Sequence, residues 1–358
     1  MTTAVVFGLG FVIAYVNGAN DVSKGIATLA GSGVTNYRKA IRWGALFTAL
    51  GGIAGAVLAG AMVQTFGKGL LQPGASATLT AAIATIVGAA AWVLIATRMG
   101  LPVSTTHAIV GALIGVASLA YGRHAVAWHA LAQKVALPLA ASPLVAIAAT
   151  VLLARATSGL GRTDCVCAEV APTPSGSGTA AVQLQIVSCE SDRPAAARVT
   201  MGHLHWLTSG ATSFARGMND APKMAALVLA ALATSGSRHA SSPALFAWIT
   251  AGMVAGSLVA GRRVTHVLAE RVTPLDHREG FVANGVTAGL VVAGSVLGWP
   301  MSTTHVASSA IIGVGAQRRA GSLNRKTVRE MVLAWFLTLP AAGLFGTAAY
   351  EVLRLLRP

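Results

Sequence analysis

Asn20-Asp21-Val22-Ser23-Lys24 is a polar stretch in a very hydrophobic chain, and it occurs twice. It returns as Asn219-Asp220-Ala221-Pro222-Lys223, and a second motif, Pro102-Val103-Ser104-Thr105-Thr106-His107, returns as Pro300-Met301-Ser302-Thr303-Thr304-His305. The copies lie 198 or 199 residues apart, so each half keeps nearly the same separation between its two motifs. This pattern indicates an internal duplication. In a membrane protein, duplicated polar motifs are typical of a transport site where the halves meet.

The composition indicates an integral membrane protein. Of 358 residues, 54% are hydrophobic and 10% are charged, whereas a typical soluble domain carries about 25% charged residues. The net charge of +15 comes from basic residues in short loops, which favours membrane topology over nucleic-acid binding. Without a basic n-region, the apolar N-terminus is expected to stay as the first helix. Most apolar stretches approach the ~20 residues of a helical span, and they cover 43–62, 77–97, 128–153, 244–260, 281–299 and 331–353.

A polar segment divides the chain into two membrane repeats. Residues 156–201 are rich in Ser, Gly, Thr and Pro, and they predict a flexible linker between repeat 1 (1–155) and repeat 2 (202–358). The three cysteines of this linker lack the spacing of a zinc site, so neither a metal nor a structural disulfide is expected. Each half has the same order: an Asn-Asp helix, two spans, a Thr-His helix and a final span. Because five crossings are an odd number, the second repeat is expected to be inverted.

The expected fold is an all-α polytopic membrane protein with about 10–12 transmembrane or re-entrant helices in two inverted-topology repeats. Loop charges agree with the inversion. In repeat 1 the loop after the Asn-Asp helix is basic, with Arg38, Lys39 and Arg42, whereas in repeat 2 the later loops hold most of the basic residues. The positive-inside rule then predicts a cytoplasmic linker and two outer termini in the cell inner membrane. Arg354 and Arg357, near the C-terminus, disagree with this orientation.

The Asn-Asp motifs place charges inside apolar helices, where each costs about 3 kcal/mol on insertion scales. Such residues normally face a cavity or pair with one another. Asp21 and Lys24, like Asp220 and Lys223, are three residues apart and share a helical face. The pairs could lock helices together or form a transport site, and their duplication favours the site. Pro222 and the glycines around both motifs are points where a helix can break and expose backbone groups.

The Ser-Thr-Thr-His motifs resemble the beginning of a helix. A proline followed by Ser and Thr suits the cap and first turn, and a helix N-terminus presents unpaired N–H groups with partial positive charge. Two such ends near a pseudo-two-fold axis could hold one tetrahedral oxyanion. Ordinary capping is the alternative interpretation, which the duplication makes less favourable.

Three further residues have open roles. His107 and His305 could donate to the ligand, carry a coupling proton, or form a hydrogen bond between helices, and the last role is favoured. Arg216 precedes the second motif at the position that Asn17 occupies before the first. It could contact the anion or anchor its helix at the membrane interface, and the anchor role is favoured.

The charges of the motifs narrow the choice of ligand. Two lysines can offset a divalent anion, and the presence of two aspartates as well favours an anion that moves together with a cation or with protons. Phosphate carries protons that a carboxylate can accept in hydrogen bonds, and sulfate does not. The aspartates therefore favour phosphate.

The two motifs are similar to those of the inorganic phosphate transporter family. Its members carry Gly-Ala-Asn-Asp-Val-Ala-Asn-Ala and a Ser-Thr-Thr-His segment in each half, and the resemblance covers nearly the whole chain outside the linker. It implies a secondary transporter that imports orthophosphate across the inner membrane, with an inverted-repeat helical fold. It also implies that the Asn-Asp residues shape the phosphate and coupling-ion sites and that Ser104, Thr105, Ser302 and Thr303 supply phosphate-binding hydroxyls.

One departure from the family signature bears on coupling. Lys24 and Lys223 occupy the position of its second Asn, and an ammonium repels sodium where an amide oxygen could coordinate it. We therefore expect proton symport, with no cofactor and no metal. The candidate coupling-ion residues are Asp21, Asp220, His107 and His305. The candidate substrate-binding residues are Asn20, Asp21, Lys24, Ser104, Thr105, Thr106, Asn219, Asp220, Lys223, Ser302, Thr303 and Thr304.

Other functions remain as alternatives. A sulfate or related oxyanion permease and a sodium-coupled phosphate symporter would keep the same fold, whereas an anion channel would need no coupled ion. A membrane phosphatase with Asp21 or His107 as nucleophile would need a metal cluster or hydrolase motif that the sequence lacks, so an enzyme is not expected. The expected partners are inorganic phosphate, a coupling cation or proton, and membrane lipid, without nucleic acid; homo-oligomer formation is left open.

Overall fold

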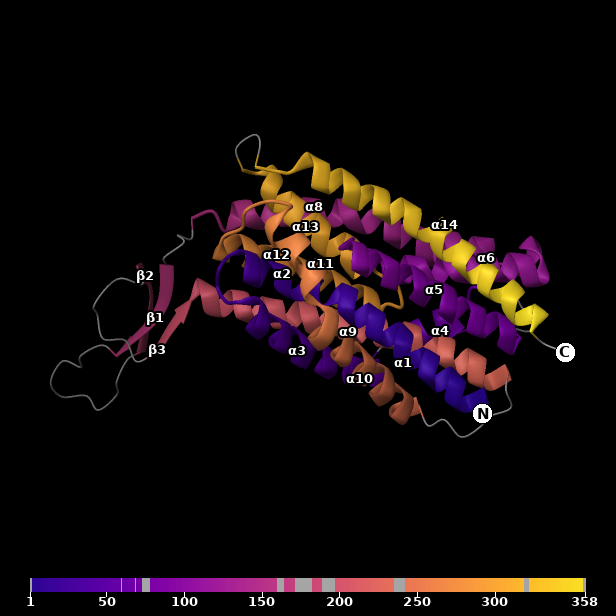
Figure 1. The fold of residues 1–358 in the computed structure, drawn as a ribbon. Helices are drawn as coiled ribbons and strands as arrows, with labels where there is room; N and C mark the ends of the chain where they lie inside the picture. The colour runs from indigo at the N-terminus through magenta and orange to yellow at the C-terminus, as the bar shows by residue number, and fades with distance from the viewer. Residues whose placement is uncertain are drawn as a thin grey trace.

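The computed structural model describes residues 2–58, 60–67, 69–72, 78–159, 164–170, 182–188, 197–234, 242–318 and 322–356. The molecule is an elongated bundle of helices, from which a small sheet projects at one end (Figure 1). Both ends of the chain lie at the opposite end of the bundle from the sheet (Figure 1).

The first half of the chain is helical. Its long helices are apolar nearly throughout, so few polar side chains face the surrounding lipid. The elements are α1 (Thr2–Asp21), α2 (Ser23–Gly31), α3 (Tyr37–Leu58), α4 (Gly60–Gly67), α5 (Leu79–Met99), α6 (Thr105–Tyr121), η1 (Arg123–Ala125), α7 (Trp128–Leu131), η2 (Ala132–Ala136) and α8 (Leu137–Ala156).

The second half repeats this order with fewer interruptions. One long helix takes the place of α1 and α2, and another takes the place of α7 and α8. The elements are α9 (Met201–Thr234), α10 (Ser242–Ala260), α11 (Arg262–Glu270), α12 (His277–Val296), α13 (Thr303–Ala316) and α14 (Arg325–Leu355).

The predicted all-α membrane fold is confirmed. Among the described residues, 7 helical segments are long and apolar enough to cross a membrane. The two Thr-His helices, α6 with 17 residues and α13 with 14, are shorter than the ~20 residues of a full span. They are therefore shortened helices, and they begin next to the buried Ser104 and Ser302. Together with the 34-residue α9, these elements fall at the lower limit of the expected number.

The helices of the two halves pack reciprocally. Helix α3 packs on α9 and its counterpart α10 packs on α1; likewise, α6 packs on α14 and α13 packs on α8. The short helices follow the same rule, since α4 contacts α9 and α11 contacts α2. Two repeats related by a two-fold axis would produce this exchange, so the packing fits the predicted inverted repeat.

Glycines allow the helices of opposite halves to approach closely. Gly51 of α3 lies against the Phe214 carbonyl of α9, and Gly256 of α10 lies against the Tyr15 carbonyl of α1. A Cβ atom at either position would overlap with the facing backbone. Small residues are the usual means of close packing between membrane helices, and here they bring the two motif-bearing helices into the centre.

The linker contains a sheet that the sequence analysis did not predict. Strand β1 (Asp164–Val170) pairs antiparallel with β2 (Val182–Ser188) and with β3 (Ala197–Thr200). Alternating apolar and polar residues in Val182-Gln183-Leu184-Gln185-Ile186 were the available signal, and the flanking Ser, Gly and Pro masked it. Cys165 and Cys167 belong to β1, whereas Cys189 lies outside the described residues.

We predict that the close glycine contacts are essential to stability. Gly51→Leu and Gly256→Leu should each destabilise the protein by about 1–3 kcal/mol, because the added side chain must push two backbones apart. Thermal unfolding in detergent, followed by size-exclusion fluorescence, measures this effect. Gly8→Leu is the matched control, because nothing lies within 4 Å of a Cβ at that position. Equal melting temperatures for all three variants would contradict the prediction.

Candidate functional site

The Asn-Asp motifs lie on the central helices α1, α2 and α9. Val22 separates α1 from α2, but its backbone is α-helical (φ −55°, ψ −31°) and its N–H donates to the Gly18 carbonyl at 3.2 Å, so the first motif lies on a nearly continuous helix. The second motif runs through α9 without interruption, although Pro222 lies inside that helix. The helix therefore opens at neither motif, although the sequence marked both as places where it could break.

The charged residues of both motifs are sealed from solvent. Lys24 and Lys223 are each 1% exposed, and Asp21 and Asp220 are 1% and 3% exposed. The Ser-Thr-Thr-His residues are buried as well. In this structure the motif residues are therefore closed off from solvent.

Lys24 is held by oxygen atoms of its own helical turn. Its Nζ donates to Asp21 Oδ1 at 2.7 Å, to Asn20 Oδ1 at 2.6 Å and to the Asn20 carbonyl at 2.9 Å. All three N–H donors of the ammonium therefore have an oxygen partner.

Lys223 forms the equivalent ion pair but also reaches the other repeat. Its Nζ lies 3.2 Å from Asp220 Oδ1 and 3.2 Å from the Met301 carbonyl, and it donates to Thr106 Oγ1 at 2.8 Å. Thr106 belongs to the Thr-His helix of repeat 1. The Lys223 ammonium of repeat 2 therefore makes one of its hydrogen bonds to a residue of repeat 1.

Asn17 connects the two aspartates, and the sequence analysis did not select it. Its Nδ2 lies 2.9 Å from Asp21 Oδ2, 3.2 Å from Asp220 Oδ2 and 3.0 Å from Thr105 Oγ1. The Thr105 hydroxyl also donates to Asp21 Oδ2 at 3.3 Å. One amide therefore brings a carboxylate from each repeat together. The sequence did contain a signal for Asn17, because this residue lies one helical turn before Asp21 and so on the same face of the helix.

The amides of Asn20 and Asn219 position the loops before the Thr-His helices. Asn20 donates to Thr97 Oγ1 at 2.9 Å and to the Leu101 carbonyl at 3.0 Å. Asn219 donates to the Met301 carbonyl at 3.0 Å. Each motif thus orients the helix beginning of its own repeat.

The Thr-His helices begin with the expected caps. Ser104 accepts a hydrogen bond from the His107 amide, and Ser302 accepts one from the His305 amide, both at 3.2 Å. Thr304 Oγ1 donates to the Val103 carbonyl at 2.7 Å across the repeats, while Thr303 is buried in the first turn of α13. The bond from Thr304 therefore brings the beginning of α13 next to the segment that precedes α6.

The two histidines contact each other through their rings. The centroids of His107 and His305 are 4.5 Å apart, and the His305 centroid is 4.2 Å from that of Trp335. His107 Nδ1 has no hydrogen-bond partner within the described residues. Ring packing, rather than the expected hydrogen bond, therefore joins α6 to α13. The rings also line a cavity of about 510 Å³ whose other walls are mostly apolar.

Arg216 is not an interfacial anchor, so the favoured interpretation was wrong. Its side chain is 0% exposed, one turn before Asp220 on α9. Nη2 donates to Thr48 Oγ1 at 2.6 Å and to Ser257 Oγ at 3.4 Å. An interfacial arginine would extend toward water, whereas this one lies in the centre of the bundle.

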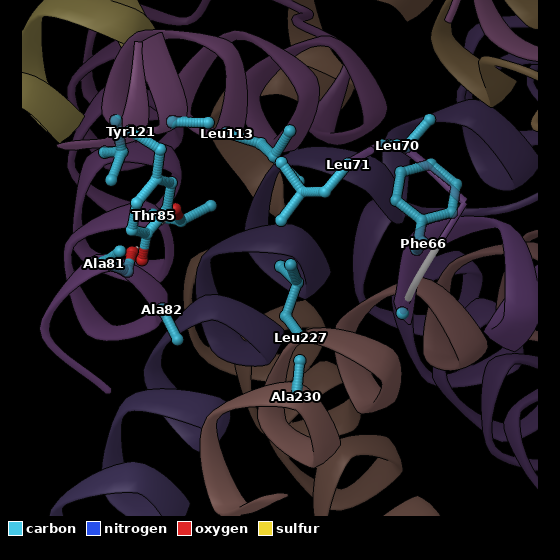
Figure 2. A pocket seen from close by; sticks show the side chains of 13 residues that line it. Phe66, Leu70, Leu71, Ala81, Ala82, Thr85, Leu113, Tyr121, Leu227 and Ala230 are labelled. Carbon is cyan, nitrogen blue, oxygen red and sulfur yellow. Dashed lines mark hydrogen bonds between the residues drawn. The ribbon is translucent and has the colours of Figure 1, made fainter. Parts of the chain in front are cut away.

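A separate cavity between α4, α5, α6 and α9 lacks the chemistry of an anion site. Phe66, Leu71, Leu113 and Leu227 point into it in Figure 2, and its volume is about 60 Å³. None of the motif residues lines it. The motif residues therefore lie in the buried network and not in this cavity.

Comparisons with known proteins agree with the motifs. Residues 17–346 match the phosphate transporter family. A protein of Pyrococcus horikoshii that is named as a phosphate permease is 29% identical, over 97% of both chains. A protein of Rhizobium meliloti that is named as a low-affinity inorganic phosphate transporter is 29% identical, over 94% of this chain and 92% of its own.

A solved structure supports the fold. The protein named "The sodium-dependent phosphate transporter" superposes with a TM-score of 0.81 at 24% identity, over 99% of this chain and 100% of its own. At that identity the similarity extends to the fold alone. Because the family match runs through both repeats and includes both motif pairs, the chain belongs to the phosphate transporter family.

Proposed function

We propose that this transporter imports inorganic phosphate by proton symport and that its two central lysines replace bound cations. The family membership identifies a transporter and not an enzyme. The observation that carries the proposal is the shell of oxygen atoms around each ammonium. Lys24 Nζ has carboxylate, amide and carbonyl oxygens at 2.6–2.9 Å.

Such oxygens are the ligands that hard cations use in proteins, and exposed backbone carbonyls coordinate sodium in transporters with broken helices. Here the ammonium occupies the shell. A sodium ion at the same place would meet a positive charge at contact distance, which is strongly unfavourable in a dry interior. In this proposal the chain shares the fold of the sodium-dependent relative but not its coupling ion.

The proposed substrate site lies where the carboxylates of Asp21 and Asp220 face the beginnings of α6 and α13. The beginnings of these two helices supply partial positive charge. Their Ser and Thr side chains supply hydroxyls: Ser104, Thr105, Thr106, Ser302, Thr303 and Thr304. Protonated phosphate can donate to carboxylates, which sulfate cannot do. The names of the relatives also favour phosphate over sulfate.

The same contacts provide a basis for coupling. Lys223 bonds to Thr106, and Thr304 bonds to the Val103 carbonyl, so both bonds cross between the repeats. Alternating access by movement of one repeat against the other must break them. We propose that protonation of the Asp21 and Asp220 carboxylates weakens their lysine pairs, and that His107 and His305 assist proton movement.

The proposed orientation follows from the loop charges and the domain boundaries. Repeat 1 (1–155) and repeat 2 (202–358) would insert in opposite directions in the cell inner membrane, with the linker (156–201) in the cytoplasm and both termini outside. The position of the sheet and the chain ends at opposite ends of the bundle supports this arrangement (Figure 1).

We predict that a proton gradient drives phosphate uptake into proteoliposomes at fixed membrane potential. A sodium gradient at equal pH on both sides should have no effect. Radiolabelled phosphate uptake measures both, and competition with unlabelled sulfate and arsenate tests the substrate. Uptake driven by sodium alone would contradict proton coupling, and sulfate competition as strong as that of phosphate would contradict the substrate.

We predict that the double variant Lys24→Asn, Lys223→Asn changes the ion dependence. Proton-driven uptake should fall at least about tenfold, because each aspartate loses the partner whose release is coupled to transport. Removing one partner of a buried pair costs about 3–5 kcal/mol, so the melting temperature must be measured in parallel. Lys39→Asn, at an exposed lysine, is the control. Wild-type substrate and ion dependence in the double variant would show that the lysines are structural.

A further inference from the structure

The buried centre contains one positive charge without a counterpart. Lys24 pairs with Asp21 and Lys223 pairs with Asp220. Arg216 is also fully buried, yet in the described part of the chain it forms no ion pair. An isolated charge in a low-dielectric interior costs several kcal/mol. A buried cation with no acidic partner is therefore a candidate for binding an anion.

The guanidinium also has unused hydrogen-bond donors. Its Nη2 is taken by Thr48 and Ser257, but Nε and Nη1 have no partner within the described residues. Buried polar groups are nearly always hydrogen-bonded. The protein thus satisfies one nitrogen of Arg216 and leaves two for another group.

The neighbouring carboxylates have unused acceptors. Asp21 accepts from Lys24, Asn17 and Thr105, and Asp220 accepts from Asn219, Lys223 and Asn17. A carboxylate offers about four acceptor positions, so each has about one left. Arg216 lies one helical turn before Asp220 on α9, and the Asn17 amide joins Asp220 to Asp21, so all three groups lie in one buried region.

The free donors of Arg216 and the free acceptors of Asp21 and Asp220 would together suit a ligand that can both accept and donate hydrogen bonds. A protonated tetrahedral oxyanion, such as phosphate or arsenate, accepts through its unprotonated oxygens and donates through its hydroxyls. Fully deprotonated sulfate can only accept, so it would leave the aspartates facing negative oxygens. The site therefore distinguishes protonated oxyanions from sulfate by chemistry rather than by size.

Four helices hold the guanidinium in place. Thr48 belongs to α3, Ser257 belongs to α10, and the Ser257 hydroxyl in turn donates to the Gly18 carbonyl of α1 at 3.2 Å. A purely structural group joining α9 to α3 and α10 would need neither a charge nor two unpaired nitrogens. The arrangement instead presents a fixed cation to the centre.

We infer that Arg216 is an oxyanion-binding residue of the transport site and that it binds the substrate together with free acceptor positions on Asp21 and Asp220. This inference rests on the proposed phosphate transport. It adds a binding group that neither duplicated motif contains, and it makes the two repeats unequal, since Asn17 holds the corresponding position in repeat 1.

The test is direct binding of inorganic phosphate to the purified full-length protein in detergent, without gradients. Arg216→Gln should raise the dissociation constant about 10- to 100-fold, because charge-assisted hydrogen bonds are lost. Arg216→Lys should have a smaller effect, since it keeps the charge. Arg98→Gln, which neutralises an exposed arginine, should leave binding unchanged. The melting temperature of each variant, measured in parallel, separates a lost phosphate contact from a loss of folding, and competition by sulfate and arsenate tests the selectivity that the aspartates provide.

The outcomes separate this inference from the proposed function. If the wild-type protein binds no phosphate, phosphate transport itself is refuted. If the wild-type protein binds and transports phosphate, but Arg216→Gln has the same dissociation constant and selectivity, only the role of Arg216 is refuted. If Arg216→Gln does not fold, Arg216→Lys decides: a raised dissociation constant for phosphate supports the inference, and an unchanged dissociation constant overturns it.

Discussion

The amide of Asn17 between the carboxylates of Asp21 and Asp220 is the contact on which the rest of the structure depends. Two negative charges from different repeats can approach each other in an apolar interior only if donors compensate them. Lys24 and Lys223 provide most of this compensation. The glycine contacts between α1 and α10 and between α3 and α9 pack each charged helix closely against a helix of the other half of the chain.

This constraint explains why the Thr-His helices are short. Helices α6 and α13 begin next to the buried Ser104 and Ser302, where their positive ends complement the nearby carboxylates. A full-length span would instead place intrahelical backbone bonds at the same depth and leave no free N–H groups. The hydroxyl of Thr106 and the carbonyl of Val103 then join the repeats through bonds that are strong but exchangeable.

Much of the site could be predicted because its residues are duplicated. The spacing of three residues between Asp and Lys predicted that the two side chains share a helical face, where they form ion pairs. The Pro-x-Ser-Thr-Thr-His pattern predicted the beginning of a helix, where each Ser accepts a hydrogen bond from the His amide three residues later. Asn17 and Arg216 were missed or misjudged, because a single polar residue beside a motif does not reveal whether its side chain turns inward. The strands of the linker were missed because a few alternating residues were outweighed by the surrounding Ser, Gly and Pro.

The sequence by itself determined the membrane environment, the duplication and the local elements, since hydrophobicity, helix caps and i,i+3 pairs act within one segment of chain. Only the tertiary structure decided which charges meet. Asn17 reaches Asp220 across 203 residues of chain, and Arg216 is enclosed by side chains from α3 and α10. Such contacts depend on how helices cross and how closely their backbones approach, and this geometry is set by packing between repeats, which no local pattern encodes.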